Sequence, residues 1–97
     1  MSEVFEYTGK GCHVPDDIVS VRFHASVVEV DDYIFKGISS LQSINIPSTL
    51  IKIGKNAFAS CESLVEVELN DGLSEIGEYA FDGCNSLQSI TYLPWFK

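Results

Sequence analysis

The stretch "KNAFASCESL", residues 55–64, returns as "EYAFDGCNSL" at residues 78–87, twenty-three residues later. An Ala-Phe pair, a Cys, a Ser and a Leu keep their places in both copies. A Phe followed three residues later by a Cys has two interpretations. It is either a paired metal or redox site, or a packing unit that occurs twice.

The apolar residues of the rest of the chain follow the same period. From residue 4 to residue 92 no insertion interrupts this register, and eight columns of positions spaced 23 apart are apolar. Such a period predicts a stack of short units that bury a shared core. The matching columns are Phe35/Phe58/Phe81, Ile38/Cys61/Cys84, Ile34/Ala57/Ala80, Ile18/Leu41/Leu64/Leu87, Val21/Ile44/Val67/Ile90, Phe23/Ile46/Leu69/Tyr92, Val4/Val27/Leu50/Leu73 and Tyr7/Val30/Ile53/Ile76.

Residues 41–63 show what one unit contains. "LQSINI", residues 41–46, ends in an alternation of apolar and polar residues, which predicts a short strand. Pro47 begins a turn, and Leu50 and Ile53 belong to a second short extended segment. In "NAFASC", residues 56–61, Phe and Cys stand three apart, which is the spacing of one helical turn.

The composite unit "LQSINIPSTLIKIGKNAFASCESL" resembles the BspA-like class of leucine-rich repeat. The resemblance covers residues 27–92 well and residues 4–23 weakly, and in the first clear unit Ile34 replaces Ala and Ile38 replaces Cys. It implies an α/β repeat solenoid with short parallel strands on one face and short helical turns opposite. Members of the family are often surface or adhesion proteins, so the resemblance predicts the fold better than the function.

The two ends of the repeat array are expected to cover its first and last coils. We expect residues 1–26 to form a degenerate N-terminal capping coil, because Cys12 stands where the period places Phe35. Residues 27–92 are the repeats. Residues 93–97, which contain "LPWF", are expected to form a C-terminal aromatic cap, and all three parts make one domain.

The composition bounds the partners and the location. A net charge of −8 and a pI of about 4.4 argue against nucleic acid and anionic membranes, and favour a basic partner. No apolar run approaches the roughly 18 residues of a membrane span, so no membrane insertion is expected. The chain as given shows no signal-peptide pattern, which predicts a cytoplasmic protein; a fragment of a longer chain would be compatible with the cell surface.

Charged residues also follow the period. Stacked strands place equivalent residues about 4.8 Å apart, so each exposed column is a ladder of neighbours. Two columns alternate in sign, and we expect the lysines to lie between acidic residues: Glu29/Lys52/Glu75 and Asp32/Lys55/Glu78.

The outward residues of the predicted strands are the candidate partner-binding surface, because the family's usual recognition surface is this face. The alternative is an ordinary polar sheet surface. These residues form two columns along the stack, one that begins with Ser20 and one that begins with Arg22. The middle of the surface is acidic, and Arg22 is a basic residue at its N-terminal end. The candidate residues are Arg22, Ser43, Asn45, Glu66, Glu68, Ser89 and Thr91.

No enzyme signature occurs in the sequence, so we expect a protein that is not an enzyme and has no cofactor. Cys12-His13 is an adjacent nucleophile and base, but adjacency rarely supplies hydrogen-bonded geometry. Cys12, His13 and His24 match no zinc spacing, and His24 is better read as the start of a turn. The pairs Asp16-Asp17 and Asp31-Asp32 are better read as turn residues than as a calcium site.

The leading functional hypothesis is a non-catalytic module that binds a protein partner on its strand face. The alternatives are a structural or adhesive segment of a cell-surface repeat protein, and a hydrolase or redox protein that uses Cys12. The solenoid ends expose strand edges, so the chain is expected to be a monomer or to associate weakly with itself.

The period decides between the two interpretations of Phe-x-x-Cys. Ile38 shares a column with Cys61 and Cys84, so the column requires a small or medium-sized apolar residue rather than a thiol. With three cysteines, we expect reduced thiols, because the two stacked side chains point inward in parallel.

Overall fold

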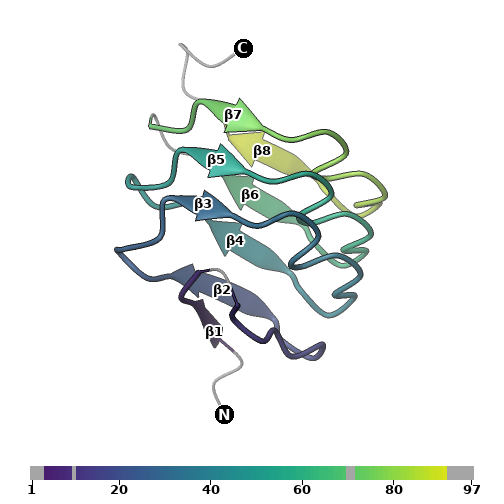
Figure 1. Cartoon of the computed structure of the whole chain (residues 1–97). Helices are drawn as coiled ribbons and strands as arrows, with labels where there is room; N and C mark the ends of the chain where they lie inside the picture. The colour runs from purple at the N-terminus through teal and green to yellow at the C-terminus, as the bar shows by residue number, and fades with distance from the viewer. Residues whose placement is uncertain (1–3, 10, 70–71, 92–97) are drawn as a thin grey trace.

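The computed structural model describes residues 4–9, 11–69 and 72–91, and within them the regular structure consists of short strands. The strands form two parallel sheets that run side by side along the stack (Figure 1). The larger sheet has five strands, in the order β1 (Val4–Tyr7), β2 (Ser20–Phe23), β4 (Ser43–Asn45), β6 (Glu66–Glu68) and β8 (Ser89–Thr91). The smaller sheet has three, in the order β3 (Glu29–Val30), β5 (Lys52–Ile53) and β7 (Glu75–Ile76).

The 23-residue period is the pairing offset of both sheets. In the larger sheet Ile44 pairs with Val67, and Val67 pairs with Ile90. In the smaller sheet Val30 pairs with Ile53, which pairs in turn with Ile76. The expected repeat fold with parallel strands is therefore confirmed, and each apolar column runs perpendicular to the strands.

The core lies between the two sheets and the turns. The columns predicted to point inward are buried in the middle of the stack, where Leu41, Leu50 and Leu64 are fully covered. Phe35 and Phe58 stack with ring centroids 5.1 Å apart and planes at 1°, and Phe58 and Phe81 stack at 5.5 Å and 4°. The aromatic column predicted from the period is therefore a continuous stack of rings.

The prediction of short helical turns opposite the strands is wrong. The described residues there form consecutive turns and contain no helix. In residues 54–61, the N–H groups of Ala57, Ala59 and Cys61 close turns onto the carbonyls three residues before them. The N–H groups of the residues between them donate to the next coil, as Phe58 does to Ala80 at 2.8 Å.

Backbone conformation explains why these turns do not become helix. Asn56 and Ser60 have positive φ, and so do their equivalents one coil earlier and one coil later: Tyr33, Gly37, Tyr79 and Gly83. An α-helix needs negative φ throughout and keeps its hydrogen bonds within the segment. A left-handed residue at every fourth position instead turns alternate N–H groups toward the neighbouring coil, so that the turns stack as the strands do.

The first strand corrects the predicted register of the N-terminal segment. The period aligned Val4 with Val27 and Tyr7 with Val30, but β1 pairs with β2, placing Val4 opposite Ser20 and Tyr7 opposite Phe23. The physical reason is aromatic packing: the buried Tyr7 ring lies 5.9 Å from that of Phe23 and 5.4 Å from that of Phe35. The alternation of Phe5, Glu6 and Tyr7 was the sequence signal for this strand.

The predicted aromatic cap, residues 93–97, lies outside the described residues, as does Tyr92.

Candidate protein-interaction surface

The candidate surface is the outward side of the five-stranded sheet, here called the strand face. Its first column runs through pairs that join Ser20 to Ser43, Ser43 to Glu66 and Glu66 to Ser89. Its second column contains the residues that lie two positions further along each strand. They are Arg22, Asn45, Glu68 and Thr91.

The structure places Arg22, Ser43, Asn45, Glu66 and Glu68 on the outward side of the sheet, and the strand register brings Glu66 and Glu68 close to Ser43 and Asn45. Asn45 pairs with Glu68, and Glu68 with Thr91. For Ser89 and Thr91 the structure describes the backbone alone.

The centre of the strand face is an acidic depression. It is lined by Ser43, Ile44, Asn45, Glu66 and Glu68, and both glutamates are exposed. Within the described residues neither carboxylate belongs to an ion pair. Two unpaired carboxylates beside a hydroxyl and an amide form a surface that can accept hydrogen bonds from a cationic group.

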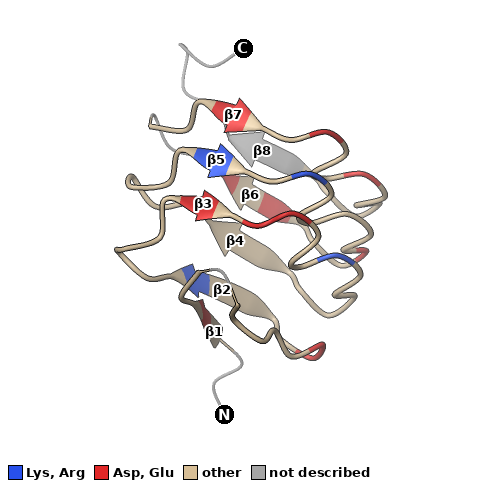
Figure 2. Cartoon of the chain, in the orientation of Figure 1, with Lys and Arg blue, Asp and Glu red and all other residues tan. Residues whose placement is uncertain are grey.

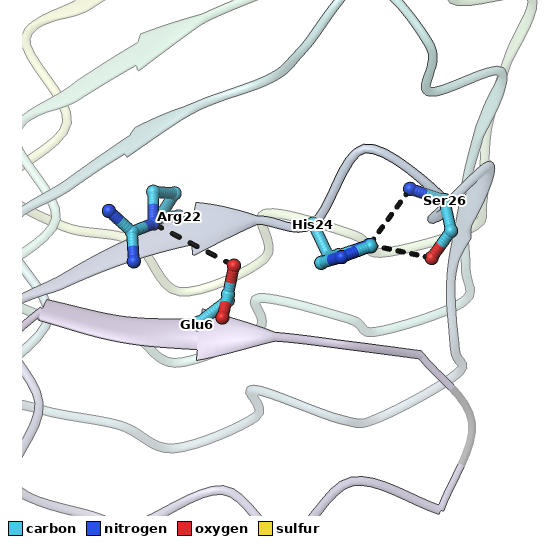
Figure 3. Close-up of polar contacts among 4 residues, drawn as sticks. All are labelled: Glu6, Arg22, His24 and Ser26. Carbon is cyan, nitrogen blue, oxygen red and sulfur yellow. Dashed lines mark hydrogen bonds and ion pairs between the residues drawn. The ribbon is translucent and has the colours of Figure 1, made fainter.

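Arg22 is separate from this acidic centre. Its Nε lies 3.9 Å from Oε2 of Glu6, the residue opposite it on β1 (Figure 3). The Arg22 side chain is largely exposed and that of Glu6 is partly exposed, so the ion pair contributes little to stability. Glu6 therefore belongs to the strand face, although sequence reasoning missed it because the period aligned β1 with the wrong strand.

The alternating charges of the smaller sheet are confirmed for one of the two predicted columns. Figure 2 shows β5 in blue between the red strands β3 and β7, and Glu29, Lys52 and Glu75 pair in register. The Lys52 ammonium lies 3.9 Å from the Glu75 carboxylate. In the second column the Asp32 carboxylate accepts a hydrogen bond from the backbone N–H of Lys55 at 2.9 Å.

The cysteines are free thiols, as expected, and two of them have a role that the sequence did not reveal. The Cys61 thiol donates to the backbone carbonyl of Phe35 at 3.2 Å, and the Cys84 thiol donates to that of Phe58 at the same distance. Burial raises the pKa of Cys61 to about 12, and burial also raises the pKa of Cys84. Both thiols are therefore protonated packing groups, which supports the packing interpretation of Phe-x-x-Cys.

His24 begins a turn, as the sequence predicted. Its carbonyl accepts from the Val27 N–H at 2.9 Å, and its Nδ1 accepts from the Ser26 N–H at 3.0 Å (Figure 3). The Ser26 hydroxyl lies 2.7 Å from the same nitrogen. The ring thus serves as a local cap for the chain reversal.

Among residues 4–9, 11–69 and 72–91, no group of three His, Cys, Asp or Glu side chains is placed to hold a metal ion. Those residues also contain no helix of the length and apolarity that a membrane crossing requires.

The fold and the strand face define a repeat protein whose coils stack through parallel strands. The chain matches the family model of the BspA type leucine rich repeat region, in 6 copies, over residues 6–95. This match covers most of the 97 residues, so the chain belongs to that family. The comparison with curated proteins and the comparison with solved structures gave no match. Membership in the family suggests a protein-interaction or adhesion-type repeat module.

Proposed function

We propose that this protein is a non-catalytic leucine-rich-repeat solenoid module that binds a protein partner on its strand face. The observation that carries the proposal is the unpaired acidic centre at Glu66 and Glu68, flanked by Ser43 and Asn45. The β-sheet holds these four side chains in register, so the surface is formed before the partner arrives and little ordering is required on binding.

The charge of the surface indicates the chemistry of the partner. The chain carries a net charge of −8, and no described cation neutralises the centre of the strand face. A protein surface with exposed Lys or Arg side chains is attracted to this centre and is held by charge-assisted hydrogen bonds. Nucleic acid and anionic membrane surfaces are repelled by the same charge. The proposal involves no cofactor and no catalytic residue.

The test is a pull-down from the native cell extract with two double variants. Glu66→Lys with Glu68→Lys reverses the acidic centre. Glu62→Lys with Glu78→Lys makes the same change in net charge at two exposed glutamates outside the strand face. We expect a partner that is retained by the wild type and by the Glu62/Glu78 variant and is lost from the Glu66/Glu68 variant. Equal retention by all three proteins would contradict the strand-face site.

A second candidate function is a structural or adhesive segment of a cell-surface repeat protein. The observation that favours it is the outer position of β1 and β8, each of which has one neighbouring strand in the larger sheet among the residues that the structure describes. Exposed strand edges are templates for pairing with another chain. Multi-angle light scattering over a range of concentrations tests this candidate: a rising mass favours end-to-end association, and a constant monomer mass argues against it.

A further inference from the structure

The three-stranded sheet begins one strand later than the five-stranded sheet. β1 pairs with β2 and covers the N-terminal side of the larger sheet. Within the described residues no strand lies on that side of β3, which is the lowest of the three front strands in Figure 1. Among the described residues, β3 is therefore an open edge of the smaller sheet in the coil where the larger sheet is extended by β1.

Hydrogen bonds in the later coils show which backbone groups belong to this edge. Ile51 donates its N–H to the carbonyl of Val28 at 2.8 Å, and Gly54 donates to that of Val30 at 2.9 Å. One coil later, Ser74 and Gly77 occupy the same positions and donate to the coil before them. These two positions therefore always direct an N–H toward the preceding coil.

In the first coil the same two positions are Val28 and Asp31. The Asp31 N–H donates to the buried Tyr7 hydroxyl at 3.3 Å, so a side chain replaces the missing backbone acceptor. Among the described residues none accepts a hydrogen bond from the Val28 N–H. By equivalence with Ile51 and Ser74, that N–H is directed away from β5, toward the side that no described strand covers, and Val28 is 48% exposed.

A groove follows this edge. It separates β3 from the loop that leaves β1. Its lining residues are Thr8, Gly9, Ser26, Val27, Val28, Glu29 and Asp31.

A column of small residues agrees with the absence, among the described residues, of a strand beneath β3. At Gly54 and Gly77 an added Cβ would lie 2.5–2.9 Å from atoms of the preceding coil, so these positions exclude a side chain. The equivalent residue of the first coil is Asp31, which carries one. The side chain is tolerated because no described strand lies before β3 to exclude it.

The charges along the edge select a cation. An acidic hollow adjoins the groove and is lined by Glu29, Val30, Asp31, Asp32 and Lys52. The ladder of the smaller sheet alternates in sign from Glu75 through Lys52 to Glu29, so the next position in the ladder favours a positive charge. Ile51 and Val28 form an exposed apolar column, each with 48% of its surface exposed. A residue of an added strand that lies beside Val28 would continue this column and is therefore favoured to be apolar.

We infer that the open edge of β3 binds an extended basic peptide segment of a protein partner, which adds to the smaller sheet as a fourth strand. The segment donates to and accepts from the β3 backbone, beginning with the Val28 N–H. It places an apolar side chain against Val28 and a Lys or Arg side chain against Glu29. Strand addition of this kind draws affinity from backbone hydrogen bonds and specificity from alternate side chains.

The probe is a blocked hexapeptide of alternating valine and lysine, titrated into isotope-labelled protein and followed by amide chemical shifts. We expect saturable shifts centred on Val28, Glu29 and Asp31. A hexapeptide with glutamate in place of lysine should produce no saturable shift, because it meets like charges. Shifts centred on Ser43, Asn45, Glu66 or Glu68 would place the peptide on the strand face and overturn the inference.

Two variants separate the edge from the strand face. Val28→Pro removes the donor and should weaken binding about fivefold. Glu29→Gln with Asp31→Asn should weaken it about tenfold, whereas Glu66→Gln with Glu68→Gln, which removes the same charge, should change it less than about twofold. Equal weakening by both charge pairs would indicate non-specific attraction and overturn the inference.

A second copy of the chain is the competing occupant. Shifts at the same amides that grow with protein concentration alone would assign the edge to self-association and overturn the peptide inference. The proposed function concerns the strand face, and the inference concerns the edge of β3. The pull-down with the Glu66/Glu68 variant and the peptide titration at β3 are therefore independent, and either can fail without the other.

Discussion

The middle of the stack and its N-terminal end are built by different rules. In the middle, strands pair at an offset of 23 residues in both sheets, as Ile44 does with Val67 and Val30 does with Ile53. At the N-terminal end, β1 pairs with β2 at an offset of 16 residues, with Val4 opposite Ser20. The smaller sheet has no corresponding strand in the described residues.

The difference shows what a repeat requires from its neighbour. In the middle, each coil supplies backbone acceptors to the next coil and excludes side chains at Gly54 and Gly77. At the end, side chains take over: the Tyr7 hydroxyl accepts from Asp31, and aromatic rings from β1 cover Phe35. The following substitutions compare equivalent positions of the two regions.

The largest contrast is expected between Gly54 and Asp31, which are equivalent residues. In Gly54→Ala the new Cβ would lie 2.7 Å from the Asp32 backbone nitrogen and 2.7 Å from the Val30 carbonyl oxygen. We expect a loss of about 3 kcal/mol in the free energy of unfolding. Asp31→Ala should change it by less than about 1 kcal/mol, because Asp31 already carries a Cβ. Urea unfolding measures both, and similar losses would show that β3 is not an open edge.

A second contrast uses Ile51 and Val28, which are equally exposed. Ile51→Pro removes the N–H that donates to Val28 and leaves that carbonyl without its partner. We expect a loss of about 2 kcal/mol. Val28→Pro should cost less than about 1 kcal/mol, because proline is tolerated on an edge strand. If the two variants unfold at the same urea concentration, the Val28 N–H is needed for stability and the edge is closed.

A third contrast compares a thiol in the middle with one at the end. Cys61 is fully buried and donates to Phe35, so Cys61→Ala should cost about 1–2 kcal/mol. Cys12 is only partly buried, and Cys12→Ala should cost less than about 1 kcal/mol. A thiol reagent should modify Cys12 in the native protein and reach Cys61 only on unfolding. Rapid native modification of Cys61 would contradict its burial.

The pH dependence of Cys61 gives a fourth prediction. Its pKa rises from 9.0 to about 12 on folding, so the thiolate forms first in the unfolded chain. The contribution of Cys61 is therefore complete below pH 9 and is lost progressively as pH rises through 12. Each pH unit in that interval removes up to about 1.4 kcal/mol. The difference in unfolding free energy between wild type and Cys61→Ala should accordingly shrink above pH 9, and a constant difference would contradict the raised pKa.

The smallest contrast concerns surface charge. Lys52→Glu places three acidic residues in one column of the smaller sheet and removes the contact with Glu75. We expect a loss of about 1 kcal/mol at low salt that decreases at high salt. Arg22→Glu makes the same charge change beside Glu6 at the N-terminal end, where the Arg22 side chain is 71% exposed, and should cost less. An effect of Lys52→Glu that is independent of salt would argue against the charge ladder.

Much of the fold was predictable because the period reports it directly. The inward columns, the stacked rings of Phe35, Phe58 and Phe81, and the alternating ladder of Glu29 and Lys52 all follow from adding 23. The helical turns were predicted wrongly, since the three-residue spacing of Phe58 and Cys61 is shared by helices and by consecutive turns. The positive φ of Asn56 and Ser60 distinguishes the two, but residue type gives only a weak signal for it at Asn56 and none at Ser60.

The candidate site was predicted in part for the same reason. Period and alternation place Ser43, Asn45, Glu66 and Glu68 on one face, and the structure brings them together. Glu6 was missed because β1 does not follow the period. Sequence reasoning also missed the thiol donors at Cys61 and Cys84, because their acceptors are backbone carbonyls from another coil.

The sequence by itself determined the repeat, its phase, the buried columns and the acidic character of the strand face, because each of these depends on residue type at a fixed interval. Tertiary structure alone decided how the turns stack, which strand β1 joins, and that β3 begins its sheet. Those outcomes depend on hydrogen bonds between coils and on the packing of Tyr7 against Phe23 and Phe35. Contacts of that kind join residues of different coils, so they cannot be predicted from the spacing of residues within one unit.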